Sequence, residues 1–381
     1  MTIYLDNAAS SHPKTESVYR AVDEVLRKLG ANPGRASHAL ALKAGQRITQ
    51  TRQALARLLA VSDPDRIVFT SNATEAINLG LKGLLNSGDH VITSSMEHNS
   101  VIRPLRALEG QGIELSLVAA NSLGQIKAGE IEKTIRKNTR LIVLTHASNV
   151  TGGILPLAEI AASVKKYDLF LMVDAAQTVG VIPISVEDLR IDLLAASGHK
   201  GLMGPQGTGF LYIGPNVSLR PLIEGGTGSQ SELEIQPDFL PDRLESGTLN
   251  TPGLAGLGAG IDFILQQGVE VIRQKELSLN RVLWAGLKEN KKVRIYGPEP
   301  VEERTSALSF NIATMNPQLV ASILDTAYDM AVRPGLHCSA LAHRTLGTFP
   351  EGTVRVSPGF FNTENEMESI LKAIKAISQK V

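Results

Sequence analysis

Short apolar runs alternate with segments of helical spacing through the middle of the chain. The runs are IVFT from residue 67, HVITSS from 90, ELSLVA from 114 and LIVLTHA from 141. The helical segments that follow them begin near Thr74 or span about 99–110, 127–136 and 157–166. Strands and helices that alternate in this way predict an α/β fold, with a largely parallel sheet and helices on both of its faces.

Two further apolar runs, Leu169–Val173 and Leu193–Ala196, end abruptly in polar residues. That pattern is typical of buried parallel strands whose C-terminal ends open onto a ligand site. The polar residues at the two ends are Asp174 after the first run and Ser197, His199 and Lys200 after the second.

The flanking parts of the chain have a looser pattern. Residues 1–14 read as an extended arm, because Pro13 suits neither a central strand nor a helix interior. A Gly, Ser and Glu rich stretch at 224–236 predicts a long functional loop. We expect a large domain over residues 15–258 and a smaller α+β domain built from 1–14 and 259–381. The remaining elements expected are helices at 15–29, 39–60, 252–267, 269–290, 316–326 and 364–378, a loop at 32–38, and strands ALSFNIA, MAVR and VRVS.

Composition narrows the range of partners. The chain has 381 residues, 43% of them hydrophobic, which is enough for a large core. Its 38 basic and 38 acidic residues cancel, so charge favours neither a nucleic acid nor an anionic membrane as a partner. No signal-like N-terminus and no bilayer-spanning apolar stretch is visible, so we expect a soluble cytoplasmic protein.

An acid at one strand end and a lysine at another suit the chemistry of pyridoxal phosphate. The Lys200 amine can bond to the cofactor aldehyde, while the Asp174 carboxylate pairs with the ring nitrogen and keeps the ring an electron sink. Gln177 follows Asp174 by three residues and reaches the same ring if this segment turns helically. The alternative is that Asp174 caps a helix and Lys200 is a solvated loop lysine.

The motifs DAAQ at 174–177 and SGHKG at 197–201 resemble those of the fold type I pyridoxal phosphate enzymes in the aminotransferase class V group. Within that group they are similar to the cysteine desulfurases, with matches from Leu5 to Glu366. The resemblance implies a mostly parallel seven-stranded sheet flanked by helices, a small α+β C-terminal domain and a homodimer. It also implies pyridoxal 5'-phosphate as the cofactor, held by Lys200, and no metal.

The segment 71–75, SNATE, lies between a predicted strand and a predicted helix. Backbone N–H groups at Ala73 and the Thr74 hydroxyl can face an anion across the helix N-terminus. An ordinary N-cap is an equally good interpretation of these residues alone. The resemblance favours a phosphate site and adds Ser197, His199 and, from a second subunit, Thr248.

Four more residues gain a role from the resemblance. His98, after the strand HVITSS, is expected to stack on the cofactor ring and to act in catalysis, and Asn149 to bond the cofactor hydroxyl and the substrate. Arg355 can offer a bidentate fork to a substrate carboxylate, with Arg333 as a weaker candidate nearby. Without the resemblance, they read as a satisfied polar histidine, a turn asparagine and exposed arginines.

Cys338 is the only cysteine, which excludes an intrachain disulfide and, within one chain, a thiolate zinc cluster. The stretch 332–339, VRPGLHCS, resembles the desulfurase motif that carries the nucleophilic cysteine, with Leu336 where better-known members carry a histidine. Pro334 and Gly335 open a loop here, which suits an exposed, reactive thiolate. A buried cysteine that only fills space is the alternative. The short span to Arg355 predicts a short cysteine loop.

The sequence therefore predicts a cysteine desulfurase that converts L-cysteine to L-alanine and leaves a persulfide on Cys338. A sulfur-acceptor protein, as in iron–sulfur cluster assembly, is then expected as a partner. A selenocysteine lyase, a C–S lyase or an aminotransferase on the same fold is the nearest rival. A nucleotide-binding dehydrogenase is disfavoured, because no G-x-G-x-x-G follows the first strand; a non-catalytic binding protein would hold no cofactor.

Overall fold

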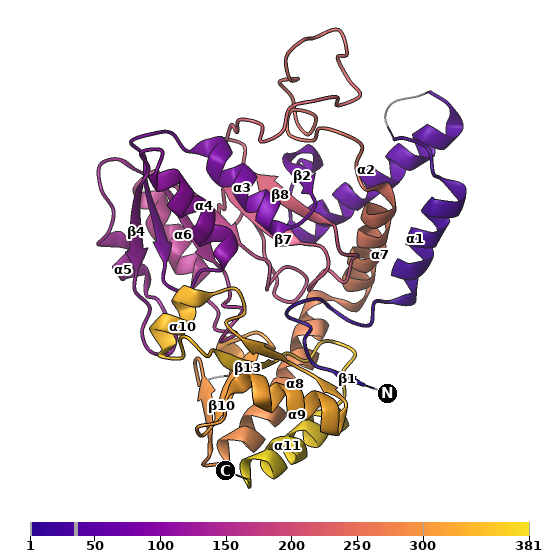
Figure 1. Ribbon diagram of the computed structural model, residues 1–381. Helices are drawn as coiled ribbons and strands as arrows, with labels where there is room; N and C mark the ends of the chain where they lie inside the picture. The colour runs from indigo at the N-terminus through magenta and orange to yellow at the C-terminus, as the bar shows by residue number, and fades with distance from the viewer. Residues whose placement is uncertain (1, 34–36, 300, 381) are drawn as a thin grey trace.

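A computed structural model of the chain describes residues 2–33, 37–299 and 301–380. A seven-stranded sheet lies at the centre of the larger part of the molecule (Figure 1). Its order is β2-β8-β7-β6-β5-β3-β4; β8 is antiparallel to both neighbours and the other pairs are parallel. The predicted mostly parallel sheet is confirmed. The strands are β2 (Ile67–Thr70), β3 (His90–Ser94), β4 (Glu114–Val118), β5 (Thr139–Thr145), β6 (Phe170–Asp174), β7 (Leu193–Ser197) and β8 (Gly209–Ile213).

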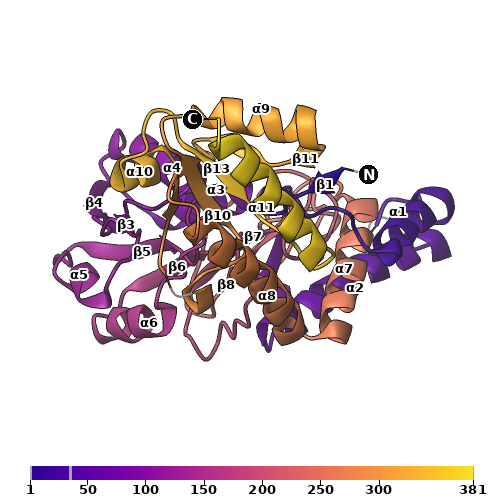
Figure 2. The ribbon, with the colours of Figure 1, turned by 90° about the horizontal axis from the view of Figure 1, so that it is seen from below.

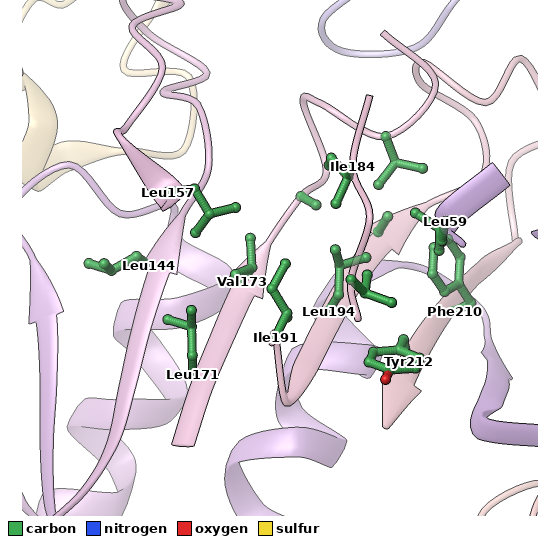
Figure 3. Packing of buried hydrophobic residues seen from close by; sticks show 14 of the residues in the cluster. Leu59, Leu144, Leu157, Leu171, Val173, Ile184, Ile191, Leu194, Phe210 and Tyr212 are labelled. Carbon is green, nitrogen blue, oxygen red and sulfur yellow. The ribbon is translucent and has the colours of Figure 1, made fainter. Parts of the chain in front are cut away.

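Both faces of this sheet are buried, which explains why its strands read as continuous apolar runs. Along β7, Leu193 and Ala195 pack into one hydrophobic cluster while Leu194 and Ala196 pack into another. Side chains alternate between the faces of a strand, so the two clusters lie on opposite sides of the sheet. Figure 3 shows the cluster that contains Leu194.

The helices cover these two faces and extend the molecule at its ends. Thr363 and Glu366 form a capping box at the start of α11, a device that satisfies free N–H groups of the first turn. Among the described residues no helix has the length and apolar character needed to cross a membrane. The helices are α1 (Glu16–Lys28), α2 (Ala39–Leu59), α3 (Ala73–Leu84), α4 (Asn99–Glu109), α5 (Ala128–Glu132), α6 (Leu157–Lys166), α7 (Thr251–Gln267), α8 (Val269–Lys288), α9 (Pro317–Tyr328), α10 (Ala340–Leu346) and α11 (Glu364–Ser378).

A second, antiparallel sheet lies in the C-terminal part, where α8 and α11 pack side by side (Figure 2). Leu5 of the N-terminal arm is fully buried in the hydrophobic cluster of this part. The bounds expected for the two domains stay a prediction. The strands here are β9 (Val293–Tyr296), β10 (Leu308–Ile312), β12 (Arg333–Gly335) and β13 (Thr353–Val356), with β1 (Ile3–Tyr4) paired to β11 (Met330–Ala331).

Three local expectations differ from the structure. The helix expected at 127–136 is only the five-residue α5, and the strand MAVR is divided between β11 and β12. Helix α10, between the cysteine and the strand at Val354, is not among the helices expected from the sequence. Part of the loop predicted at 32–38 lies outside the described residues.

Gly209 of β8 fixes how closely the start of α3 approaches the sheet. A Cβ atom at this position would lie 2.6 Å from the backbone of Asn72, the N-cap residue of α3. Gly209→Ala should therefore destabilise the fold by about 1–3 kcal/mol, the usual cost of overpacking. Urea unfolding checks this, with Gly129→Ala as the control, because a Cβ there meets no atom within 4 Å. Equal unfolding free energies for the two variants would contradict the tight approach.

Candidate functional site

The C-terminal ends of neighbouring parallel strands bring the predicted polar residues to one edge of the large sheet. Asp174 ends β6, and Lys200 follows the adjacent β7. Asn149 follows β5, which pairs with β6 on the other side, and His98 follows β3, the next strand along. These four residues are far apart in sequence and converge because the strands that carry them are parallel neighbours.

Lys200 and Asp174 each affect the pKa of the other. Burial lowers the pKa of the Lys200 amine to about 8, although the nearby Asp174 charge acts in the opposite direction. Burial raises the pKa of the Asp174 carboxyl, while an N–H bond from Ala176 at 3.0 Å and the Lys200 charge favour its ionised form. A lysine with a lowered pKa is a better nucleophile near neutral pH.

The start of α3 lies against the end of β7. The backbone N–H of Ala73 donates to Ser197 Oγ at 3.0 Å, and Thr74 next to it is exposed. His199 Nδ1 is buried and has no hydrogen-bond partner in the part of the chain that the structure describes. Burial and the charges of Lys200 and Lys14 lower the His199 pKa to about 4. The N-terminal end of α3 and the unpartnered imidazole nitrogen of His199, two residues after Ser197, are both suited to binding an anion.

His98 is the N-cap of α4. Its Nδ1 accepts the backbone N–H of Ser100 at 3.1 Å, which leaves the hydrogen on Nε2 in the neutral ring. Burial first, and then the charge of Lys200, lower the His98 pKa to about 4. A neutral, half-buried ring beside the lysine is suited to stacking on a planar ligand.

Gln177 and Thr248 have other contacts. The Gln177 amide donates to the Ala8 carbonyl at 3.1 Å, and its side chain lines a small cavity together with Lys200. Thr248 is exposed, accepts a bond from Asn32 at 3.4 Å and lines a separate cavity with Ser71 of its own chain. Its predicted contact with the phosphate of a second subunit stays a prediction.

Arg355 already has a carboxylate partner inside the chain. It is almost fully buried on β13, and its Nη2 lies 2.7 Å from Asp6 Oδ1. Its Nη1 donates to the Asn149 carbonyl at 2.9 Å, whereas Nε has no partner among the described residues. Arg333 lies directly opposite on β12, a like-charge pair that is unfavourable unless anions are nearby. This pair of arginines concentrates positive charge at one place, and its binding of a substrate carboxylate stays a prediction.

Cys338 lies at the mouth of the same site. Its thiol is exposed, and Arg333 Nη2 is 3.6 Å from its Sγ. His337 and Cys338 both have positive φ angles, 49° and 60°, a conformation that costs about 1–2 kcal/mol for each residue other than glycine. Asn149 supports this turn, because its Nδ2 donates to the His337 carbonyl at 2.7 Å. The predicted exposure of the thiol therefore agrees with the structure, and the loop is short.

Several residues of the site were not predicted from the sequence as members. Asp6 pairs with Arg355, and Ser339 Oγ donates to Asn149 Oδ1 at 2.7 Å. Glu97 is fully buried behind Asp174, and this burial raises the pKa of its carboxyl to about 8. The signal that could have found Asp6 was its place directly after a short apolar strand; Ser339 and Glu97 adjoin predicted residues.

The chain is similar to known proteins over almost its whole length. The family model described as aminotransferase class-V matches residues 3–370. The chain belongs to this family. A probable cysteine desulfurase of Methanothermobacter thermautotrophicus is 35% identical to this class-V protein, over 99% of this chain and 94% of the relative. One of Pyrococcus abyssi is 36% identical, over 98% and 94%.

A solved structure supports the same assignment. The apo structure of a cysteine desulfurase from Thermococcus onnurineus NA1 is similar to this class-V protein with a TM-score of 0.93 at 33% identity. It is matched over 100% of this chain and 95% of that chain. The resemblance to the cysteine desulfurases of the class V group is therefore confirmed, and with it the fold type.

The class-V family implies pyridoxal phosphate in general terms, and the residues present fit that group. The free Nδ1 of His199 and the Ser197 hydroxyl beside the start of α3 suit its phosphate. The amine of Lys200 suits its aldehyde, and the carboxylate of Asp174 suits a protonated ring nitrogen. The site thus offers a suitable partner for the phosphate, the aldehyde and the ring nitrogen of the cofactor.

The lowered pKa of Lys200 predicts its reactivity in the cofactor-free protein. Acylation needs the neutral amine, so modification of residue 200 by acetic anhydride should rise with pH and reach half its maximum near pH 8. An ordinary lysine reaches that point near pH 10.4. Peptide mapping must separate Lys14, because burial lowers its pKa to about 8 as well. A midpoint above about pH 10 at residue 200 would contradict the desolvated site.

Proposed function

We propose that this class-V protein binds pyridoxal 5'-phosphate through Lys200 and releases sulfur from L-cysteine, giving L-alanine and a persulfide on Cys338. The observation that carries the proposal is the position of the exposed Cys338 thiol beside Arg333, in a turn bonded to Asn149. Generic pyridoxal phosphate chemistry does not need a thiol there. The names of the curated relatives support the same reaction.

The reaction balances without an external oxidant or reductant. The Cys338 thiolate attacks the substrate sulfur, the bond between that sulfur and Cβ breaks, and the carbon gains a proton. One substrate thiol and one protein thiol become one persulfide and one alanine. Pyridoxal phosphate, when bound, supplies an electron sink for charge that develops at Cα.

Other side chains bind the substrate, orient it and transfer its proton. Arg355 and Arg333 bind its carboxylate, and Asp6 keeps the Arg355 guanidinium in place. Lys200, with a pKa of about 8, exchanges a proton with Cα near neutral pH. Asn149 orients the substrate and the cofactor hydroxyl, as the resemblance implies.

We assign the cofactor contacts as the resemblance implies. Asp174 would hold the proton of the ring nitrogen, and the His98 ring, kept neutral by a lowered pKa, would stack on the cofactor. Gln177 approaches the ring from the segment after β6. The phosphate contacts are the Ala73 N–H, Thr74, Ser197, His199 and, from a second subunit, Thr248.

We propose further that the protein acts as a homodimer in the cytoplasm. It passes the sulfur to an acceptor protein. The exposure of Cys338 supports an acceptor, because a persulfide formed at this surface can be reached by another protein. A relative from Dictyoglomus turgidum, 30% identical, is named cysteine desulfurase IscS, in line with a role in iron–sulfur cluster assembly.

The thiol separates a desulfurase from the other reactions of this fold. Cys338→Ser should bind L-cysteine, seen as a change in cofactor absorption, but should release neither alanine nor persulfide, because the serine hydroxyl is a poor sulfur acceptor. Amino acid analysis after incubation with L-cysteine is the measurement. An alanine yield equal to that of the wild type would leave a selenocysteine lyase or a C–S lyase that does not need this thiol.

Asp174 should control the electron sink. Asp174→Asn removes the charge that keeps the ring nitrogen protonated, so turnover should fall by about 100-fold or more, or roughly 3 kcal/mol of barrier. The matched control is Asp192→Asn, at the opposite end of these strands, where the carboxylate accepts the Leu171 N–H at 2.8 Å. Near-normal turnover of L-cysteine in Asp174→Asn would remove this role.

A further inference from the structure

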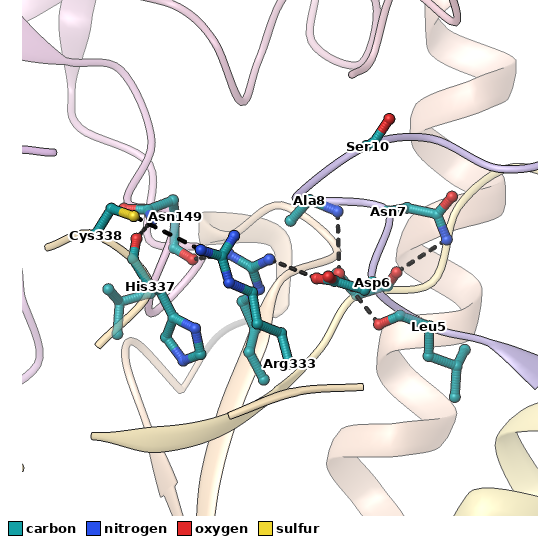
Figure 4. A network of polar contacts seen from close by, with 12 residues as sticks. Leu5, Asp6, Asn7, Ala8, Ser10, Asn149, Arg333, His337 and Cys338 are labelled. Carbon is teal, nitrogen blue, oxygen red and sulfur yellow. Dashed lines mark hydrogen bonds and ion pairs between the residues drawn. The ribbon is translucent and has the colours of Figure 1, made fainter. Parts of the chain in front are cut away.

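The side-chain amide of Asn149 is bonded to the cysteine loop at two points. Its Nδ2 donates to the His337 carbonyl at 2.7 Å, and its Oδ1 accepts the Ser339 hydroxyl at 2.7 Å. The two loop residues flank Cys338, so one amide holds the chain on both sides of the thiol. Figure 4 shows the His337 side of this arrangement. The loop is therefore fixed relative to the strand edge that carries Asn149.

The backbone of Asn149 is fixed as well. Its carbonyl accepts a bond from Arg355 at 2.9 Å, and the neighbouring Val150 carbonyl accepts one from the Ser309 hydroxyl at 2.6 Å. Asn149 itself is only 8% exposed. The amide is thus a rigid reference point rather than a mobile side chain.

The Ser339 hydroxyl is not used to cap the helix that it precedes. Ser339 is the N-cap residue of α10, but its side chain makes no cap hydrogen bond, although serine is a favoured residue for that purpose. It is fully buried, and the partner of its hydroxyl is the Asn149 amide. The residue therefore serves the loop, in which His337 and Cys338 adopt positive φ angles that need external support.

The side-chain amide of Asn149 has a second N–H group besides the one bonded to His337. The Asn149 nitrogen carries two N–H bonds, of which His337 takes one. The other is the donor expected to reach the cofactor. A single rigid group then holds the cofactor with one hydrogen and the nucleophile loop with its other bonds.

We propose that Ser339 is a positioning residue, which acts through Asn149 to hold the Cys338 thiol at a fixed place relative to the bound substrate. This inference rests on the proposed desulfurase function. Loss of the hydroxyl should affect the step that needs the thiol and leave carboxylate binding intact, because Arg355 is held by Asp6 and by the main-chain carbonyl of Asn149, neither of which bonds to Ser339.

The experiment compares Ser339→Ala, Ser339→Thr and the wild type, each loaded with pyridoxal phosphate. Single-turnover release of alanine from L-cysteine should be about 3- to 10-fold slower in Ser339→Ala, the effect of one lost hydrogen bond. Binding of L-alanine, which has no sulfur for Cys338 to attack, should keep its wild-type dissociation constant. Ser339→Thr retains the hydroxyl and should recover most of the rate.

Hydrogen exchange of the cofactor-free protein gives a readout that does not depend on activity. Peptides covering residues 336–339 should exchange about 3- to 10-fold faster in Ser339→Ala. Ser378→Ala is the matched control, since Ser378 is also buried and its hydroxyl is bonded to the Lys375 carbonyl at 2.8 Å and to the Asn290 amide at 2.8 Å, in helix α11 and outside the cysteine loop. If Ser339→Ala cannot be purified folded, Ser339→Gly replaces it, because glycine is tolerated at an N-cap.

A wild-type rate and wild-type exchange in Ser339→Ala would overturn the inference, as would a Ser339→Thr variant no faster than Ser339→Ala. Equal weakening of L-alanine binding and of turnover would also overturn it, since that pattern indicates general damage to the site. A wild-type protein that forms no alanine at all would instead refute the proposed function, and loop exchange would still test the hydrogen bond.

Discussion

Parallel pairing of β5, β6 and β7 is the constraint on which the site depends. Because the three strands run in the same direction, their C-terminal ends meet at one edge of the sheet. Asn149, Asp174 and Lys200, which follow these strands, are thereby brought together from three separate stretches of sequence. Burial of both faces fixes the register, since a shift by one residue would exchange the two hydrophobic clusters. The chemistry at the edge therefore depends on packing well away from it.

Electrostatics adds a second constraint. Arg333 and Arg355 lie opposite each other on paired strands, with Lys200 within range of both charges. Asp6 and Asp174 offset part of this positive charge, yet Arg355 Nε keeps no partner among the described residues. A cysteine desulfurase that binds an amino acid carboxylate benefits from such an excess, because the anion then completes a charge balance that the protein leaves open.

Much of this arrangement could be predicted from the sequence, because the large sheet follows from apolar runs and their polar ends. Asp174, His98 and Lys200 each follow a run that is recognisable in one dimension. Asp6 and Ser339 were missed for a different reason. Their roles come from contacts over 349 and 190 residues of sequence separation, and no local pattern encodes such a pairing. The split of MAVR and the short helix α10 depend on tertiary packing, which overrides local propensity.

The N-terminal arm contacts site residues of the large sheet and of the small sheet. Besides the Asp6 contact with Arg355, the Ala8 carbonyl accepts the Gln177 amide, and the Ser11 N–H and the Lys14 amine both donate to the His199 carbonyl. These first residues are thus structural parts of the binding pocket, although they precede the first long helix. A change in residues 6–14 therefore alters the pocket itself, as a change in a strand of the large sheet would.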